Sequence, residues 1–214
     1  MVGGVSDTSN IVTAQGIATH MPPVADPYAS DVYPAPPASC QNQSPIHNTQ
    51  TLSAGFFCGL TLNASANVTL NPGVYYIGQG GLSVNGNATL TGSNVTLVFT
   101  SSGGNYGTAT INGGATVNLT APTSGSTAGI VIFGDRNMPT DTSFKFNGGA
   151  SQAIDGALYL AKGAVNFAGG ADTSTGCTQL IADTITFVGD SNFAINCSGR
   201  GTKPIGSSAV TLVE

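Results

Sequence analysis

The stretch Val84-Asn-Gly-Asn-Ala-Thr-Leu90 decides the fold, because the chain repeats its pattern three more times. An apolar residue precedes a tight Asn/Gly corner, and a short β-prone run follows it. The later copies are Ile111-Asn-Gly-Gly-Ala-Thr-Val117, Phe146-Asn-Gly-Gly-Ala-Ser151 and Phe167-Ala-Gly-Gly-Ala-Asp172, at offsets of 27, 35 and 21 residues. Repeats of this length are typical of a solenoid, in which each turn covers the next.

Between the corners, apolar and polar residues alternate with a period of two, as Val68 and Leu70 do against Asn67 and Thr69. The runs are short, and the Asn-Gly corners recur at a similar register. Asn tolerates the left-handed backbone conformation, and stacked Asn side chains can hydrogen-bond along the axis of a stack. We therefore expect an all-β, right-handed parallel β-helix. A Greek-key β-sandwich has the same alternation and remains the alternative.

The composition supports an all-β chain. Lys, Arg and Glu are scarce and the 30 glycines are abundant, which disfavours long helices. Hydrophobic residues make up 40% of the chain, enough to form a core. Five basic and ten acidic residues give a net charge of −5, so no basic patch is available for nucleic acid or an anionic membrane surface.

The four cysteines form two local groups. Cys40 and Cys58 are 18 residues apart, and Cys177 and Cys197 are 20 apart. Three connectivities are open, and the two local pairings are the simplest. A zinc site would normally show CxxC-like spacing, which this chain lacks. We expect two disulfides that staple opposite ends of the solenoid, and hence an oxidising compartment.

The chain divides into two parts. Residues 1–50 form an irregular, Pro-rich linker or docked segment, in which Tyr28 and Tyr33 can pack against the solenoid. Residues 51–214 form the β-solenoid domain, with a final strand at 209–213. No apolar stretch has the roughly 20 residues that span a bilayer. The N-terminus lacks a signal-peptide pattern, so we expect any export signal or anchor to lie upstream of this chain.

Several stretches resemble the extracytoplasmic region of TadG-like proteins, which belong to the bacterial Tad (Flp, tight-adherence) pilus-assembly proteins. These stretches are Asn71-Pro-Gly-Val-Tyr-Tyr-Ile-Gly78, Gly81-Leu-Ser-Val-Asn-Gly-Asn-Ala-Thr-Leu90, Gly129-Ile-Val-Ile-Phe-Gly-Asp-Arg-Asn137, Ile154-Asp-Gly-Ala-Leu-Tyr-Leu160 and Cys177-Thr-Gln-Leu-Ile-Ala-Asp-Thr-Ile-Thr-Phe187. The resemblance covers residues 55–214 and consists of structural rather than catalytic motifs.

The resemblance implies a non-catalytic structural or adhesive component of a Tad pilus or of its assembly machinery. Such a protein is held at the cell surface, in a pilus or in the periplasm, by an upstream hydrophobic helix. Its implied partners are other pilus subunits or minor pilins, with surface glycans as a further candidate. Many TadG-like proteins also carry a von Willebrand A-type metal site, but its Asp-x-Ser-x-Ser motif is absent here.

The densest polar cluster is a candidate binding loop at Asp135, Arg136, Asn137, Asp141 and Lys145. It falls within the longest offset of the repeat, so we expect it to protrude, and binding residues are common on such loops. The alternative is a structural Asp–Arg pair that ties the loop down. A calcium site is a further interpretation, although the acidic residues are too sparse for a calcium loop.

The sequence predicts no catalytic residue, cofactor or metal ligand. His20 and His47 are the only histidines, and both lie in the irregular segment. The alternative function is a secreted β-helix polysaccharide lyase or hydrolase, for which Asp155 and Asp183 are the best acidic pair. Trp is absent and basic residues are few, which disfavours this alternative.

Outward Thr rows, seen at Thr89, Thr91, Thr116 and Thr120, raise a third class of function. Regular Thr and Asn ladders can bind ice or carbohydrate surfaces. Because a Thr-x-Thr motif does not occur at every turn, ice binding is not expected from the sequence. A weak adhesive surface for glycans or abiotic material stays open.

Overall fold

The structure, a computed structural model, describes residues 25–31, 33, 35–101, 104–147, 151–168, 172–173, 176–188, 192–193 and 196–205. The contact pattern divides the chain into two units. One comprises Met1–Asp31 with Lys203–Glu214, and the other comprises Val32–Thr202. The final strand predicted at 209–213 lies outside the described residues.

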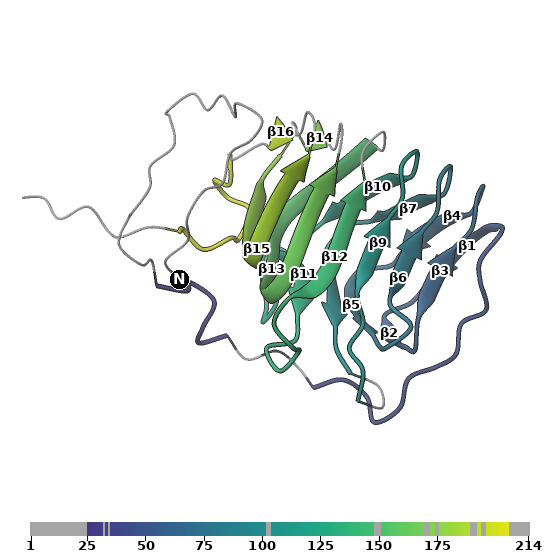
Figure 1. Ribbon diagram of the computed structural model, residues 1–214, viewed down its shortest axis with the longest axis horizontal. Helices are drawn as coiled ribbons and strands as arrows, with labels where there is room; N and C mark the ends of the chain where they lie inside the picture. The colour runs from purple at the N-terminus through teal and green to yellow at the C-terminus, as the bar shows by residue number, and fades with distance from the viewer. Residues whose placement is uncertain are drawn as a thin grey trace, which may run out of the picture. The chain divides into compact units, whose positions relative to one another are not determined.

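The Val32–Thr202 unit is a solenoid whose coils run around three faces (Figure 1). Face 1 contains β1 (Thr49–Leu52), β4 (Asn67–Leu70), β7 (Thr89–Gly92), β10 (Thr116–Thr120), the start of β13 (Ser151–Ala168), β14 (Asp172–Thr173) and β16 (Asn192–Phe193). Face 2 contains β2 (Gly55–Phe57), β5 (Gly73–Ile77), β8 (Val95–Phe99), β11 (Ile130–Gly134), the middle of β13 and the first half of β15 (Thr178–Val188). Face 3 contains β3 (Leu60–Leu62), β6 (Leu82–Val84), β9 (Ala109–Ile111), β12 (Thr142–Asn147) and the last parts of β13 and β15.

Every ladder between these described strands is parallel. The path β1-β4-β7-β10-β13-β11-β8-β5-β2 joins nine strands that curl through 281°. The strand β13 connects the two halves of this path, because it pairs with β10 on face 1, with β11 on face 2 and with β12 on face 3. The predicted all-β parallel β-helix is confirmed. The parallel pairing rules out the antiparallel Greek-key alternative.

The inward side chains stack into rows that run along the solenoid axis. The apolar residue before each corner of the repeat belongs to one such row, on face 3. The row contains Leu62, Val84, Ile111, Phe146 and Phe167, and each is almost completely buried. The rings of Phe146 and Phe167 stack with their centroids 4.7 Å apart. The repeated phrase in the sequence therefore marks the core of the solenoid.

The corners after face 3 carry an asparagine ladder. Asn112 donates its side-chain amide to the Asn85 side-chain oxygen at 2.9 Å, and Asn85 donates to the Asn63 oxygen at 2.9 Å. At the N-terminal end, the Asn63 amide nitrogen lies 3.1 Å from Nε2 of His47. The predicted hydrogen bonding of stacked Asn side chains along the axis is confirmed. His47 has a structural position at the end of that ladder.

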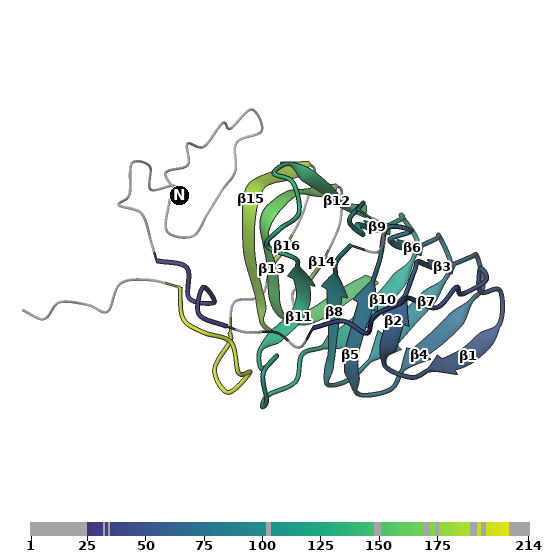
Figure 2. The same cartoon turned by 90° about the horizontal axis from the view of Figure 1, so that it is seen from below.

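The described residues of the Pro-rich segment 33–41 pack along face 2 (Figure 2). The Tyr33 ring lies with its centroid 3.9 Å from that of Phe133 on β11, and Gln41 forms a parallel bridge with Phe57 on β2. The outward-pointing side chain of Phe133 is consequently buried although it points away from the core. The segment is docked on the solenoid over these residues.

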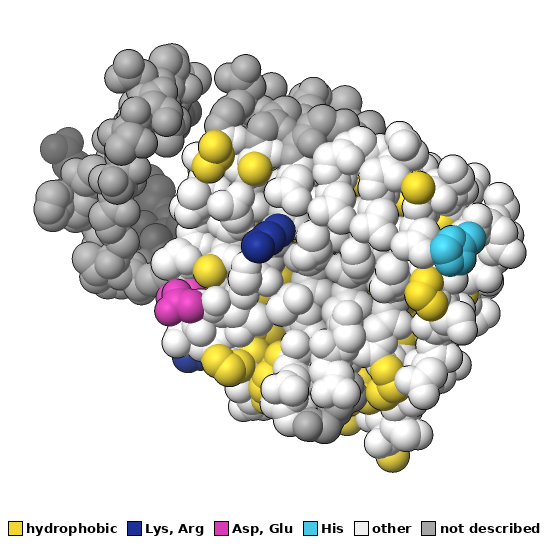
Figure 3. Space-filling view, turned by 45° about the vertical axis from the view of Figure 1, so that its right-hand side comes forward, with side chains coloured by type: hydrophobic (Ala, Val, Ile, Leu, Met, Phe, Trp, Pro, Cys, Tyr) yellow, Lys and Arg dark blue, Asp and Glu magenta, His cyan; other side chains and the backbone are white. Residues whose placement is uncertain are grey.

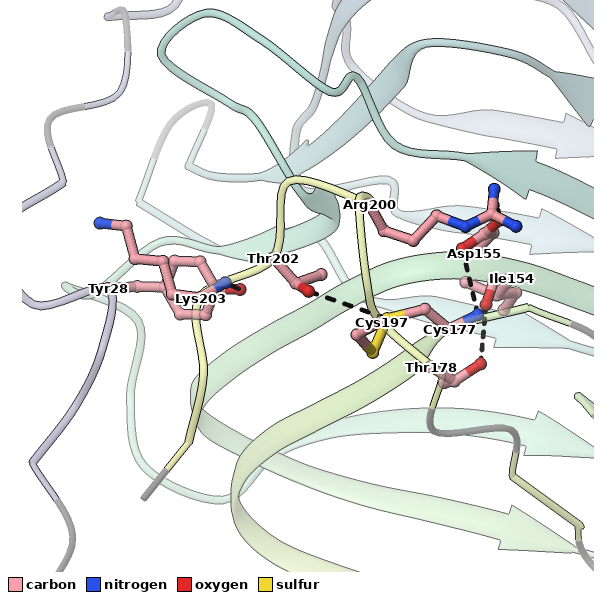
Figure 4. Close-up of a disulfide and its surroundings, with 9 residues drawn as sticks. All are labelled: Tyr28, Ile154, Asp155, Cys177, Thr178, Cys197, Arg200, Thr202 and Lys203. Atoms are coloured by element: carbon pink, nitrogen blue, oxygen red, sulfur yellow. Dashed lines mark hydrogen bonds and ion pairs between the residues drawn. A yellow bond between two sulfur atoms is a disulfide. The ribbon is translucent and has the colours of Figure 1, made fainter. Parts of the chain in front are cut away.

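Two disulfides close the ends of the solenoid. Cys40–Cys58 joins the docked segment to the corner after β2, and Cys177–Cys197 joins the last coils. Beside the second disulfide, Arg200 pairs with Asp155 at 2.7 Å (Figure 4). Both predicted pairings and their positions at opposite ends are confirmed. They indicate an oxidising, extracytoplasmic location.

In the smaller unit, described residues from the two ends of the chain contact each other. The Lys203 backbone N–H donates to the Tyr28 hydroxyl at 3.0 Å, and the Lys203 ammonium lies 5.5 Å from the centre of the Tyr28 ring. Lys203 also forms an ion pair with Asp31. Tyr28 and Asp31 are thus held to Lys203.

Candidate functional site

The predicted binding loop begins with a turn that Asp135 closes. Its carboxylate accepts a hydrogen bond from the Thr100 hydroxyl at 2.7 Å and one from the Asn137 backbone N–H at 2.9 Å. Asp135 therefore ties the turn after β11 to the preceding coil. One carboxylate oxygen accepts from a side-chain hydroxyl and the other from a backbone N–H, which is a structural role.

Arg136 lies over a cluster of aromatic rings. Its guanidinium carbon is 5.3 Å from the ring centre of Tyr159, 5.6 Å from that of Phe133 and 5.9 Å from that of Tyr33, and its Nε donates to the Tyr159 hydroxyl at 3.2 Å. A guanidinium over aromatic faces is a favourable cation–π arrangement. Arg136 thus links the loop to the docked segment as well as to β11 and β13.

The other two members of the loop lie at the surface. Asp141 is exposed, with a φ of 62°, and immediately precedes β12. Lys145 is exposed and points outward from β12 on face 3. Of the five residues, Asp135 and Asn137 are joined by a hydrogen bond, whereas Asp141 and Lys145 are exposed at the start and in the middle of β12. Within the described part of the chain, no group of three or more His, Cys, Asp or Glu side chains is placed to hold a metal ion. A binding role for the loop stays a prediction.

The acids that the enzyme alternative requires lie at different corners. Asp155 precedes Gly156 at the start of face 2, whereas Asp183 follows Ala182, the partner of Leu160 at the end of that face. At about 3.3 Å per residue the separation is roughly 15–20 Å. Two glycosidase carboxylates lie roughly 5–9.5 Å apart. Asp155 and Asp183 therefore do not form a catalytic pair.

A recess of about 510 Å³ lies where the docked segment passes over the first coils. Its lining includes Pro37, Cys40, Phe56 and Ser101, and no acid, base or histidine is among the described lining residues. Cys40 is held in a disulfide and is not a thiol. The hydroxyls of Ser39 and Ser101 are in this lining, but none of the described lining residues is a base that could activate them.

Two columns of outward-pointing Thr and Asn side chains form a regular surface on face 1, which we call the Thr/Asn face. Its outward side chains lie in register on four successive coils. One column is Thr49, Asn67, Thr89 and Thr116, and the other is Thr51, Thr69, Thr91 and Asn118. The two columns are linked within each strand. On the first three coils the aligned segments are Thr49-Gln-Thr51 in β1, Asn67-Val-Thr69 in β4 and Thr89-Leu-Thr91 in β7.

The Thr/Asn face is uniform in the exposure of its side chains and in the register of its strands. Six of its eight side chains are exposed, and Thr89 and Thr91 are half-buried. No register shift interrupts the ladders between β1, β4, β7 and β10, whereas shifts occur in the ladders of β13 with β11 and with β15. The hydroxyls of Thr69 and Thr91 lie 3.3 Å apart, which links neighbouring coils along one column.

The Thr/Asn face also carries no charge, because β1, β4, β7 and β10 contain no acidic or basic residue. Figure 3 shows how sparse charged side chains are on one side of the molecule. The other two faces differ: segment 33–41 covers part of face 2, and face 3 carries Lys145. Among the described residues, the Thr/Asn face is therefore the longest exposed, uncharged and regular surface.

The sequence identified only part of this array. Thr89, Thr91 and Thr116 were recognised, but Thr120 lies beyond the two columns, in register with Asp155. The remaining members were missed because the spacing between equivalent residues changes from 18 to 22 to 27 from coil to coil. Asn-Gly corners precede β7 and β10 and were a signal for Asn118, whereas no Asn-Gly pair precedes β1 or β4.

The chain matches no protein-family model, no curated protein and no solved structure. Within the described residues, no helix is long and apolar enough to cross a membrane. The class of molecule is therefore defined by its own geometry: a disulfide-closed parallel β-helix with a regular, uncharged Thr/Asn face.

Proposed function

We propose that this chain is a non-catalytic structural and adhesive component of a bacterial Tad (Flp) pilus or of its assembly machinery. It presents a rigid β-helix outside the cytoplasmic membrane, and the Thr/Asn face is the surface that contacts a partner. The resemblance of residues 55–214 to TadG-like proteins supports the assignment to the pilus system. The two disulfides support an oxidising location.

The observation that carries the adhesive role is the uninterrupted Thr/Asn face. Eight short polar side chains project from a backbone whose conformation is fixed by parallel ladders on both sides of each central strand. A surface that is ordered before binding loses little conformational entropy on contact. Repetition of a weak interaction over many copies then gives firm attachment, as multivalent binding does.

The proposal places the chain at the cell surface, in the pilus or in the periplasm, held by an upstream hydrophobic helix. Other pilus subunits or minor pilins are its proposed partners, and surface glycans are further candidates for contact. The low charge of the chain, with five basic residues, argues against a role in binding nucleic acid.

The test is to locate the native protein in fractionated source cells by mass spectrometry. Sheared pili, membranes and medium are compared, and a cytoplasmic protein serves as the control for lysis. We expect the protein in the pilus or membrane fraction, together with peptides of a hydrophobic helix upstream of Val2. Recovery of the protein free in the medium, with an N-terminus produced by cleavage of a signal peptide, would contradict the proposal.

A further inference from the structure

We propose that the Thr/Asn face binds the surface of ice. This inference names the ligand of the contact surface assigned above, and so rests on the proposed function. Ice is a neutral solid with a fixed two-dimensional repeat of hydrogen-bonding groups. Its recognition requires a protein surface that is regular, uncharged and rigid, and each property can be traced to described residues.

Regularity comes from the β-helix itself. Adjacent parallel strands lie about 4.8 Å apart, and alternate residues along a strand are separated by about 6.7 Å. The two columns of the face therefore form a lattice with these two spacings over four coils. Hexagonal ice likewise presents its water oxygens in planes with a fixed two-dimensional repeat, so a regular protein lattice is the kind of surface that can contact it at several points. Asn67 and Asn118 occupy lattice positions and present an uncharged amide in place of a hydroxyl.

The chemistry of the side chains also fits. Each threonine carries a hydroxyl, which donates and accepts hydrogen bonds, next to an uncharged methyl group. The hydroxyls of Thr69 and Thr91 also contact each other. Charged groups would hold water in shells that differ from the ice lattice, and the four strands contain none. The outward positions of these strands also lack aromatic rings, on which sugars stack. Ice is therefore favoured over a crystalline polysaccharide.

Rigidity comes from the layers beneath the face. The inward residues between the two columns include Val68, Leu90 and Val117, and each is at most 1% exposed. β-Branched threonines have few rotamers, so the outward groups are also restricted. The hydrogen bond between the Thr69 and Thr91 hydroxyls fixes neighbouring coils further. Little order must be imposed when the face meets a lattice.

The area of the Thr/Asn face determines how strong an effect on ice we expect. Four coils span about 14 Å between the first and last rungs, which is a small contact area. We therefore expect the purified chain to inhibit ice recrystallisation and to facet growing ice crystals, with little depression of the freezing point. Attachment of many copies to one cell or filament would strengthen the adhesion to ice.

The experiment measures ice recrystallisation and crystal shape with the purified 214-residue chain. Thr69→Lys and Thr116→Lys each place a long, charged side chain on the Thr/Asn face at a different coil. Thr61→Lys is the matched control, because Thr61 points outward from the middle of β3 on face 3. Thermal unfolding of each variant verifies that it is folded. The two face variants should need about tenfold or more protein for the same inhibition, whereas the control should match the wild type.

Three results would overturn the inference. They are an inactive wild-type chain, face variants as active as the wild type, and binding to crystalline cellulose or chitin without any effect on ice. Each of these results can be obtained with the purified chain in the absence of pili. The inference can therefore fail while the protein is still found in the pilus fraction. Conversely, ice activity of a protein secreted free into the medium would contradict only the pilus assignment.

Discussion

Asn85 donates its side-chain amide to the Asn63 side-chain oxygen, 2.9 Å away, and accepts an equivalent hydrogen bond from Asn112. Three coils are joined through this one side chain at a corner that also carries the repeat of the sequence. Replacing Asn85 by alanine removes both bonds. We expect a loss of about 1–3 kcal/mol in the free energy of unfolding, measured by denaturant titration.

The control for Asn85→Ala is Asn118→Ala, since Asn118 is exposed on face 1 rather than at a corner. We expect this variant to lie within about 0.5 kcal/mol of the wild type, as is usual for surface positions. Equal effects of the two substitutions would show that the corner ladder does not stabilise the stack.

The disulfide Cys177–Cys197 closes the C-terminal coils over a separation of 20 residues. Replacing both cysteines by serine should cost about 3 kcal/mol, because the unfolded chain regains the entropy of the open loop. The Cys40–Cys58 pair, with a separation of 18, is the matched comparison and should show a similar loss. Unfolding by heat under oxidising and reducing conditions measures both. A protein whose stability is insensitive to reduction would contradict this role.

Arg136→Ala should loosen the docked segment 33–41, because Arg136 lies against the rings of Tyr33, Phe133 and Tyr159. Hydrogen exchange should accelerate at backbone amides of the segment while the strands of face 1 stay protected. Arg136→Lys, which keeps the charge without the planar guanidinium, should have a smaller effect. Lys145→Ala, which removes an exposed cation from β12, serves as the control. Unchanged exchange in Arg136→Ala would disprove the anchoring role.

Tyr75 should make the fold sensitive to alkali. Burial raises the pKa of its hydroxyl to about 12 from the ordinary 10, partly offset by a hydrogen bond with the Asn71 backbone. The folded state therefore favours the neutral hydroxyl, which also donates to the Leu52 carbonyl at 2.8 Å. This contribution to stability is complete below pH 10 and is lost as the pH rises from 10 to 12.

The measurement for Tyr75 is the free energy of unfolding as a function of pH, compared between the wild type and Tyr75→Phe. Phenylalanine removes the ionisable group, so the variant should be less stable at neutral pH but lose less stability above pH 10. Identical pH profiles would show that Tyr75 does not titrate in the folded state within this range.

The core and the corners could be predicted from the sequence because they depend on local patterns. Apolar residues such as Val84 and Ile111 precede each Asn-Gly corner, and stacking then places them in one inward row. The disulfide pairs could be predicted because Cys40 and Cys58 are close in the sequence, as are Cys177 and Cys197. Predicting these features does not require the register between coils that are far apart in the sequence.

The binding surface could not be predicted in the same way, because it depends on register between coils of different length. Thr49 pairs with Asn67 over 18 residues, whereas Thr89 pairs with Thr116 over 27, since loops of unequal length intervene. The role of Arg136 was also missed, because its partner Tyr33 is far away in the sequence and belongs to a segment without regular structure.

The central claim, that the Thr/Asn face is the contact surface of the protein, is tested most directly by the attachment of source cells. Cells that produce full-length protein with Thr69→Lys and Thr116→Lys are compared with cells that carry Thr61→Lys, at equal surface levels of protein. We predict that the double face variant lowers the number of attached cells to that of a deletion strain, while the control attaches normally. Normal attachment of the face variant, with the protein folded and displayed, would contradict the account.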